Sequence, residues 1–241
     1  NRIWWFCALY IIALVPAMLL RDFTPSNELR YLSIADEALR DGRFFAFTNQ
    51  GFPYADKPPL YLWWVMLCRV IAGKHCMLLL SLMTLIPAAI TLSVMDQWTR
   101  RNVDSSTRAV TCMMLATCVM FLGAVMVLRM DMLMCMFIIL ALRSFWIWHT
   151  EYNPRSSQRW LFPLWIFLGV FTKGPLAFLI PLAGTAVYLV IQGQLKLFFR
   201  YWSWSTWGIL LALCAVWFGA VYADGGSEYL DNLLFHQTVG R

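Results

Sequence analysis

Long uncharged, apolar stretches recur along the chain, and they limit its fold more than any other feature. A helix needs about 20 apolar residues to cross ~30 Å of hydrocarbon. The stretches are Ile3–Leu20, Met77–Met95, Ala109–Leu128, Met132–Leu142, Trp160–Thr172, Leu176–Gln192 and Ser205–Tyr222. Only 13% of the 241 residues are charged, whereas soluble domains carry about 25% charged residues. We therefore expect an all-α polytopic membrane protein.

The lengths of these stretches predict about seven transmembrane helices. Ala109–Trp148 would extend about 60 Å as a helix at 1.5 Å per residue, so it must cross twice, with a turn near Gly123–Asp131. Lys173-Gly174-Pro175 interrupts the region Trp160–Gln192, which forms either one long kinked helix or two short ones. Ile3–Leu20 is longer than a signal peptide core and is expected to stay as the first span.

Basic residues predict the orientation of the helices. The short loops after the second, fourth and sixth spans contain Arg100, Arg101, Arg108, Arg155, Arg159, Lys196 and Arg200. The turns on the other side contain only Arg129 and Lys173. Because loops rich in Lys and Arg stay in the cytoplasm, we expect Arg21–His75 and Ala223–Arg241 outside. The net charge of +6 comes from membrane-flanking loops and does not indicate nucleic-acid binding.

The long outer loop Arg21–His75 is expected to contain two amphipathic interfacial helices. Thr24-Pro25 reads as the start of the first helix, and Gly42 as its end. Pro58-Pro59 precedes the second, Leu60–Ala72, whose thirteen residues make ~20 Å of helix, too short to cross a bilayer. The acid and the lysine of Asp56-Lys57 therefore lie at the level of the lipid headgroups.

Several short motifs occur in one order along the chain. They are Glu28-Leu29-Arg30-Tyr31, Gly42, Tyr54-Ala55-Asp56-Lys57-Pro58-Pro59-Leu60, Arg129-Met130-Asp131, Thr172-Lys173-Gly174-Pro175 and His236 with Arg241. In this order, over essentially the whole chain, the sequence resembles the bacterial members of the protein O-mannosyltransferase-like superfamily. The lipid A aminoarabinose transferases are the most similar group within it.

The resemblance implies a GT-C-like bundle that forms a single glycosyltransferase domain over residues 1–241, as the N-terminal catalytic part of a longer chain. It implies a polyprenyl-phosphate-linked sugar, such as an undecaprenyl derivative, as donor. The acceptor would be a hydroxyl of lipid A, a glycan or a protein. Such an enzyme would be a multi-pass protein of the bacterial inner membrane, with its active site on the periplasmic face.

The resemblance also implies roles for individual residues. The family has an Asp-Glu pair before x-Arg-Tyr in the first outer loop, and its acidic residue is taken as the base. Here the pair reads Asn27-Glu28, so either Glu28 or Asp56 is expected to be the catalytic carboxylate. The residues expected to bind substrate are Asn27, Arg30, Tyr31, Lys57, Lys173 and Arg241. Asp56 is the candidate ligand should a divalent metal take part.

Two other functions remain open from the sequence. A transporter or lipid flippase would use Arg129, Asp131 and Lys173 as an intramembrane charge relay, with the charges near the middle of the bilayer. A noncatalytic member of the same fold would have lost its base, and Asn27 is consistent with that.

Overall fold

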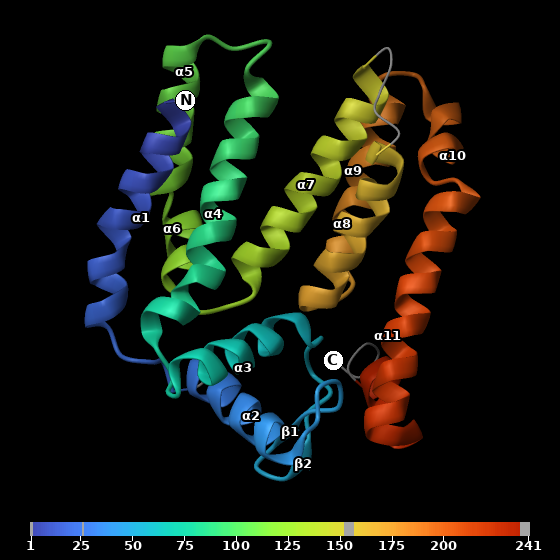
Figure 1. Ribbon diagram of the computed structural model, residues 1–241. Coiled ribbons are helices and arrows are strands. Elements are labelled where there is room, and N and C mark those ends of the chain that lie inside the picture. The colour runs from blue at the N-terminus through green and yellow to red at the C-terminus, as the bar shows by residue number, and fades with distance from the viewer. Residues whose placement is uncertain (1, 26, 152–156, 237–241) are drawn as a thin grey trace.

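The molecule has two parts, a bundle of upright helices and a smaller layer that lies across one end of the bundle (Figure 1). The computed structural model describes residues 2–25, 27–151 and 157–236. We call the smaller part, residues 21–76, the juxtamembrane layer. The end of the bundle that it covers is the layer end.

The seven apolar stretches all form bundle helices, and Ala109–Leu128 forms two of them, α5 and α6. These are α1 (Arg2–Leu20), α4 (Met77–Thr99), α5 (Ser105–Thr117), α6 (Val119–Met126), α7 (Asp131–Thr150), α8 (Ser157–Lys173), α9 (Leu176–Ile191) and α11 (Trp204–Asp231). Helix α4 packs against α1 and α7, and α7 packs against α8 and α9. Helix α11 reaches the bundle through α8. The expected polytopic helical fold is confirmed.

Fewer than seven helices are long enough to cross a membrane alone. Four described helices, α1, α4, α7 and α11, pass on length and apolar character, and the pair α5 and α6 makes a fifth if its 58° bend lies within one span. Helices α8 and α9 have 17 and 16 residues, about 25 Å at 1.5 Å per residue. The structure therefore confirms a multi-pass membrane protein but not seven full-length spans.

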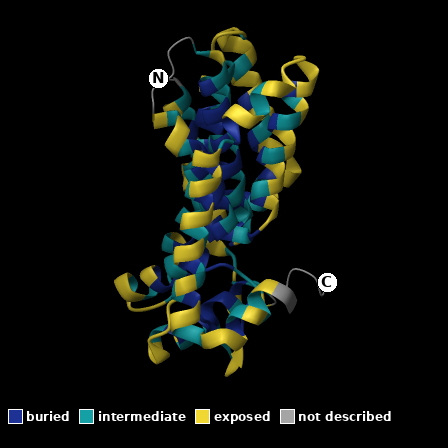
Figure 2. Ribbon diagram, turned by 90° about the vertical axis from the view of Figure 1, so that its right-hand side faces the viewer, coloured by how far each residue is buried: buried dark blue, intermediate teal, exposed yellow. Residues whose placement is uncertain are grey.

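Exposed residues lie on the outward faces of the bundle, and buried residues lie between the helices (Figure 2). Many of the exposed residues are large and apolar. Leu20 is 88% exposed, Val119 83% and Met120 82%. In water, a surface of this kind would associate with other apolar surfaces. It suits contact with lipid tails.

The turn at Lys173-Gly174-Pro175 separates two short helices, which decides between the two alternatives that the sequence left open. Gly174 has a φ of +103°, a left-handed conformation that glycine adopts without a steric penalty. Pro175 then stands at the N-cap of α9. Helices α8 and α9 pack together from this turn.

The juxtamembrane layer contains the two expected interfacial helices. Helix α3 spans Leu60–Ala72, as predicted. Helix α2 spans Glu28–Asp41 and ends at Gly42, which has a left-handed φ of +67°. Its start differs from the prediction at Thr24-Pro25. The Thr24 N–H donates to the Glu28 carboxylate over 2.8 Å, and the helix begins only at Glu28.

A short antiparallel hairpin between α2 and α3 was not predicted. Its strands are β1 (Thr48–Asn49) and β2 (Phe52–Pro53). Gln50 and Gly51 both have positive φ, 55° and 81°, as tight hairpin turns require. Glu37 of α2 accepts hydrogen bonds from the Gln50 N–H at 2.7 Å and the Thr48 hydroxyl at 2.9 Å, which fixes the hairpin on α2.

The two ends of the bundle differ in charge, as the sequence predicted. The last turns of α4, α7 and α9 and the first turns of α5 and α8 lie at the end opposite the juxtamembrane layer (Figure 1). This end also includes η1 (Leu195–Leu197) and α10 (Phe198–Tyr201). The basic loop residues named above lie in these segments or directly beside them, except Arg155, which is outside the described residues. The turns with Arg129 and Lys173, and η2 (Asn232–His236), lie at the layer end.

Candidate active site

Asp56 and Lys57 lie in the short connection from the hairpin to α3, which we call the step. Their side chains are 13% and 19% exposed, and Lys57 Nζ lies 3.8 Å from Asp56 Oδ2. The Tyr54 hydroxyl donates to the same Asp56 oxygen over 3.4 Å. Pro58 and Pro59 are buried behind this step. The prolines therefore fix the backbone next to the point where an acid and an ammonium group lie side by side.

Arg30 and two tyrosines adjoin this step. The Arg30 guanidinium carbon lies 5.7 Å from the centre of the Tyr54 ring and 5.9 Å from that of Tyr31, within the range of cation–π attraction. Arg30 Nη2 donates to Asn27 Oδ1 over 3.0 Å. Arg30 Nε is buried and has no hydrogen-bond partner among the described residues, so it retains a donor for a ligand.

Tyr31 and Tyr54 stay protonated at neutral pH. Burial is the largest cause that raises the pKa of Tyr31, against the lowering effect of Arg30 and Arg129, and the Asp56 charge raises it further. Burial also raises the pKa of Tyr54, and the charge of Asp56 adds to it. Because the charges of Arg30, Arg129 and Asp56 all affect the pKa of Tyr31, these three groups lie near its ring. Both phenols are hydrogen-bond donors there.

An ion pair joins the start of α7 to the end of α8 at the layer end. Asp131, the first residue of α7, accepts a hydrogen bond from Lys173, the last residue of α8. Their side chains are 32% and 29% exposed. Leu60, three residues after Lys57, packs against the apolar cluster of Leu133, Met136 and Phe137 in α7. This cluster joins the segment that contains Asp56 and Lys57 to the helix that begins with Asp131.

The Glu28 carboxylate points into a different set of contacts. Arg21 donates to both of its oxygens, at 2.7 and 2.8 Å. The backbone N–H groups of Thr24 and Leu128 donate at 2.8 and 2.7 Å. Glu28 is only 2% exposed. Burial, the largest single effect, raises its pKa, but the hydrogen bonds from Arg21, Thr24 and Leu128 together outweigh it, so the pKa is lowered.

The structure thus brings most of the predicted residues together, while other partners hold Glu28. Arg30, Tyr31, Asp56 and Lys57 form one cluster, Asn27 joins it through Arg30, and Lys173 lies at the same end, paired with Asp131. Glu28 is close in sequence but is held by other partners. Arg241 lies outside the described residues.

The sequence analysis gave no role in a transferase site to three residues that the structure places here: Tyr54, Arg129 and Asp131. All three stand inside motifs that it singled out, so position in a motif was the available signal. Cations outnumber acids in the combined group, which contains Arg30, Lys57, Arg129, Lys173, Asp56 and Asp131. Such a balance suits an anionic ligand.

The residues at this end do not form a metal-binding cage of their own. Among the described residues, no group of three His, Cys, Asp or Glu side chains comes close enough together to hold an ion. Asp56 is a single hard oxygen ligand. Mg²⁺ is often bound by one or two carboxylates with the rest supplied by water and phosphate, and Asp56 fits that type of site and no larger one.

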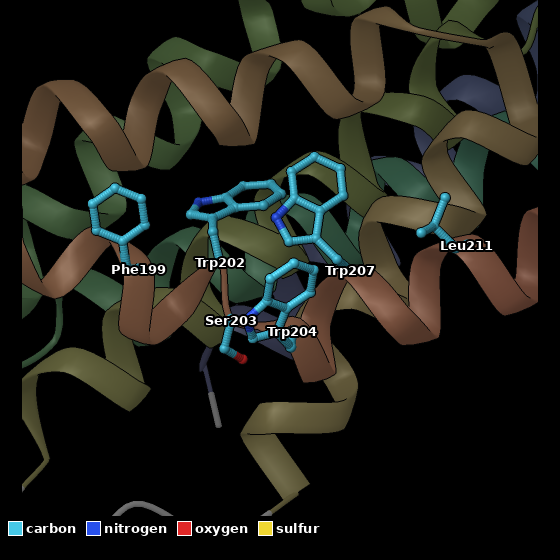
Figure 3. A pocket seen from close by; sticks show the side chains of 6 residues that line it. All are labelled: Phe199, Trp202, Ser203, Trp204, Trp207 and Leu211. Carbon is cyan, nitrogen blue, oxygen red and sulfur yellow. The ribbon is translucent and has the colours of Figure 1, made fainter.

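Two hollows lie at the opposite end. One, of about 430 Å³, is lined by six residues near the start of α11. Figure 3 shows the rings of Phe199, Trp202, Trp204 and Trp207 around it. The other, of about 300 Å³, lies between the end of α7 and α10. Neither contains a residue of the cluster around Asp56, so the candidate site remains at the layer end.

Comparison with solved structures shows which fold this is. The crystal structure of ArnT from Cupriavidus metallidurans bound to undecaprenyl phosphate matches 98% of this chain with a TM-score of 0.82, at 18% sequence identity. The chain has the ArnT fold. The apo structure of the same ArnT matches with a TM-score of 0.80. The resemblance inferred from the motifs is therefore confirmed for the fold.

Two sequence relatives have a transferase activity in their names. Both are called undecaprenyl phosphate-alpha-4-amino-4-deoxy-L-arabinose arabinosyl transferase. The protein of Pseudomonas savastanoi pv. phaseolicola (strain 1448A / Race 6) is 23% identical over 89% of this chain and 40% of its own length. That of Shewanella sediminis (strain HAW-EB3) is 27% identical over 90% of this chain and 39% of its own length.

The match to ArnT concerns part of that protein. The chain spans about two fifths of the length of these relatives and 44% of the ArnT structure. No family model matches the chain. The shared part includes both the bundle and the juxtamembrane layer, because the structural match covers nearly every residue here.

Proposed function

We propose that the chain is the membrane domain of a glycosyltransferase that moves a sugar from a polyprenyl-phosphate donor to an acceptor hydroxyl. The observation that carries this proposal is the cluster at the layer end, where Asp56 and Lys57 meet Arg30 and Tyr31 beside the Asp131–Lys173 pair. The fold supports it, because the ArnT structure that matches this chain is bound to undecaprenyl phosphate.

The cations of the cluster hold the donor phosphate. When the sugar leaves, the bond between its anomeric carbon and the phosphate oxygen breaks, and the phosphate keeps the electron pair. Its charge rises from −1 toward −2, so fixed positive groups stabilise the transition state more than the ground state. Lys57, Lys173 and Arg30 are placed for this role, and Arg241 is assigned to it by resemblance.

The acceptor hydroxyl must lose a proton as its oxygen attacks the anomeric carbon, and Asp56 is the carboxylate best placed to take it. A general base needs an acceptor lone pair that faces the substrate. Each Glu28 oxygen already accepts two short hydrogen bonds. Asp56 lies beside Lys57, one of the cations proposed to hold the phosphate, with Lys57 Nζ 3.8 Å from Asp56 Oδ2. We assign Asp56 as the base and Glu28 as an anchor of the layer.

The remaining predicted residues in the described part of the chain lie beside this cluster. Asn27 and Tyr31 lie next to Arg30 and offer an amide and a phenol to the sugar or the acceptor. Lipid A, another glycan and a protein hydroxyl remain the candidate acceptors. The sugar follows the relatives, whose names specify 4-amino-4-deoxy-L-arabinose.

The site is proposed to face the periplasm from the inner membrane. The support is the separation of charge along the bundle, because basic loops gather at the end away from the juxtamembrane layer and basic loops stay cytoplasmic. A polyprenyl-phosphate sugar carried across the membrane would then meet its acceptor at the outer leaflet.

The geometry favours the transferase over a transporter. A charge relay through the membrane requires ionisable groups in the middle of spans, whereas Asp131 begins α7 and Lys173 ends α8 at the layer end. A noncatalytic member of the fold is favoured by one observation, the amide at Asn27, whose oxygen accepts from Arg30.

Three substitutions in the full-length protein test the proposal. Asp56→Asn should lower sugar transfer from an undecaprenyl-phosphate donor by about 10² to 10⁴, the usual contribution of a general base, while undecaprenyl phosphate still binds. Lys57→Ala should weaken binding of undecaprenyl phosphate by about tenfold or more. Glu28→Gln should reduce transfer only in proportion to the loss of folded protein.

Asp41→Asn and Lys74→Ala are the matched controls, because both side chains are exposed and lie in the same layer. Full transfer by the Asp56→Asn variant would reject Asp56 as the base. Binding of undecaprenyl phosphate without any transfer by the unaltered protein would instead support the noncatalytic alternative.

A further inference from the structure

The outer part of α11 is hydrogen-bonded to the segment that leads into the hairpin. A single oxygen, Asp224 Oδ2, accepts from three successive backbone N–H groups, those of Phe44, Phe45 and Ala46, at 2.9, 2.7 and 2.9 Å. Successive N–H groups that converge in this way form a strong site for an anionic oxygen. Asp224 therefore fixes the beginning of the hairpin segment to a spanning helix 178 residues further along the chain.

Tyr229 makes the second attachment. Its hydroxyl accepts from the Phe47 N–H at 3.1 Å and donates to the Tyr54 carbonyl at 2.6 Å. Phe47 and Tyr54 are also joined to each other, because the Tyr54 N–H donates to the Phe47 carbonyl over 2.8 Å. One buried phenol thus holds both sides of the hairpin stem, with the side chain of Tyr229 at 7% exposure.

The backbone of α11 is adapted to this contact. A Cβ atom on Gly225 would lie 2.5 Å from the Cβ of Ala46, a distance that the structure could not accept without shifting. Gly226 has φ +73° and ψ −175° and interrupts the helix there. Asp224 and Tyr229 can both face the hairpin because of this break. The two glycines allow the close approach.

The attachment ends next to the proposed reaction centre. The Tyr54 carbonyl that accepts from Tyr229 belongs to the residue whose own hydroxyl contacts Asp56. Ala55, between them, is 6% exposed and packs in the same apolar cluster as Ala46 and Tyr229. Movement of α11 relative to the hairpin would therefore displace Asp56 and Lys57.

We infer that Asp224 and Tyr229 are positioning residues, which act through Tyr54 to fix Asp56 and Lys57 at the distance that a lipid phosphate requires. The inference rests on the proposed function. Helix α11 contributes no side chain to the cluster around Asp56. Through Asp224 and Tyr229, the geometry of that cluster nevertheless depends on the position of α11 in the membrane.

A double-mutant cycle on the full-length protein tests the inference. The variants are Tyr229→Phe, Lys57→Ala and the two combined, and the measurement is the affinity for undecaprenyl phosphate in detergent. Tyr229→Phe should weaken binding about tenfold, while adding it to Lys57→Ala should cause little further loss. Such non-additivity shows that Tyr229 acts through Lys57, because independent sites give additive effects.

Tyr222→Phe is the matched control, since Tyr222 lies in the same helix and is 58% exposed. Asp224→Asn should reproduce the effect of Tyr229→Phe. Unchanged affinity in Tyr229→Phe, or an equal loss in both backgrounds, would overturn the positioning role while the proposed function stands.

A second measurement remains informative if the unaltered protein binds no undecaprenyl phosphate, which would reject the proposed function. Tyr229→Phe should then still speed amide hydrogen exchange in residues 44–57 of the protein alone, relative to Tyr222→Phe. Equal exchange in the two variants would show that α11 does not fix this segment, and the inference would be wrong.

Discussion

Glu28 shows how a residue chosen for its chemistry can also serve the architecture. Its four hydrogen bonds join the end of α1, the start of α2 and the turn before α7, since the donors are Arg21, Thr24 and Leu128. Loss of one partner from a buried ion pair is far more destabilising than loss of an exposed one. The layer thus depends on this carboxylate being charged.

We expect Glu28→Gln to lower the free energy of unfolding by about 3 kcal/mol at pH 7, the range for breaking a buried pair. The pKa of Glu28 is lowered from 4.5, so its stabilising contribution is complete above that pH. The contribution is lost as the pH falls through the lower folded-state value. Thermal unfolding between pH 7 and 3 should therefore show the largest difference from wild type near neutrality.

Glu228→Gln is the control for this measurement, because Glu228 is exposed. It should leave the melting temperature unchanged. A Glu28→Gln variant with the same melting temperature as wild type at every pH would contradict the anchoring role.

The sequence predicted which residues lie together better than it predicted their contacts. Asp56, Lys57, Arg30 and Tyr31 were predicted from motifs that lie within 30 residues of one another, and they do form one cluster. The role of Glu28 depends on the N–H of Leu128, 100 residues away. No local pattern records which backbone group will reach a carboxylate at that separation.

Close packing between α8 and α9 makes their connection sensitive to single atoms. A Cβ on Gly169 would lie 2.7 Å from the Cβ of Ala177. The two short helices therefore approach each other through a glycine and an alanine, as is common between membrane helices. This contact holds Lys173 beside Asp131.

We expect Gly169→Ala to destabilise the protein by about 1 to 3 kcal/mol, the usual cost of an added methyl group in a packed core. Thermal unfolding in detergent measures it. Gly208→Ala is the control, since a Cβ there meets nothing within 4 Å. That variant should be neutral or slightly stabilised, because alanine favours a helix over glycine by about 1 kcal/mol. Equal stability of both variants would contradict the packing argument.

Among the elements, those governed by local residue chemistry were predicted best. Helix α3 begins after Pro58-Pro59 and has the expected bounds, and α2 ends at Gly42 as expected. The start of α2 and the hairpin were not predicted correctly. Both depend on side chains that accept backbone N–H groups, Glu28 for the first and Glu37 for the second.

For the whole molecule, the charge difference between the two ends predicts a testable orientation. In bacterial spheroplasts, a membrane-impermeant maleimide should label Gln50→Cys at the hairpin turn. Asn102→Cys, in the loop from α4 to α5, should react only after the membrane is permeabilised. Protein with its native cysteines is the background control. The reverse pattern would place the candidate site in the cytoplasm and reject a periplasmic acceptor.

The sequence predicted the helical stretches correctly, but the structure does not confirm seven full-length spans. Composition marks α8 and α9 as apolar, yet their lengths depend on the turn at Gly174 and on the connection from α7. The bend between α5 and α6 at Cys118 was also not predicted. Bends of this kind depend on packing against neighbouring helices.

The juxtamembrane layer is inserted between α1 and α4, two helices that pack side by side. During evolution, recombination between homologous genes can exchange such an insert as one unit. Leu128 and Asp224 restrict that freedom, because each belongs to a distant segment and is bonded to the insert. A chimaera that takes the layer from a related enzyme should therefore function only when the α6 to α7 turn and the outer end of α11 come from the same parent.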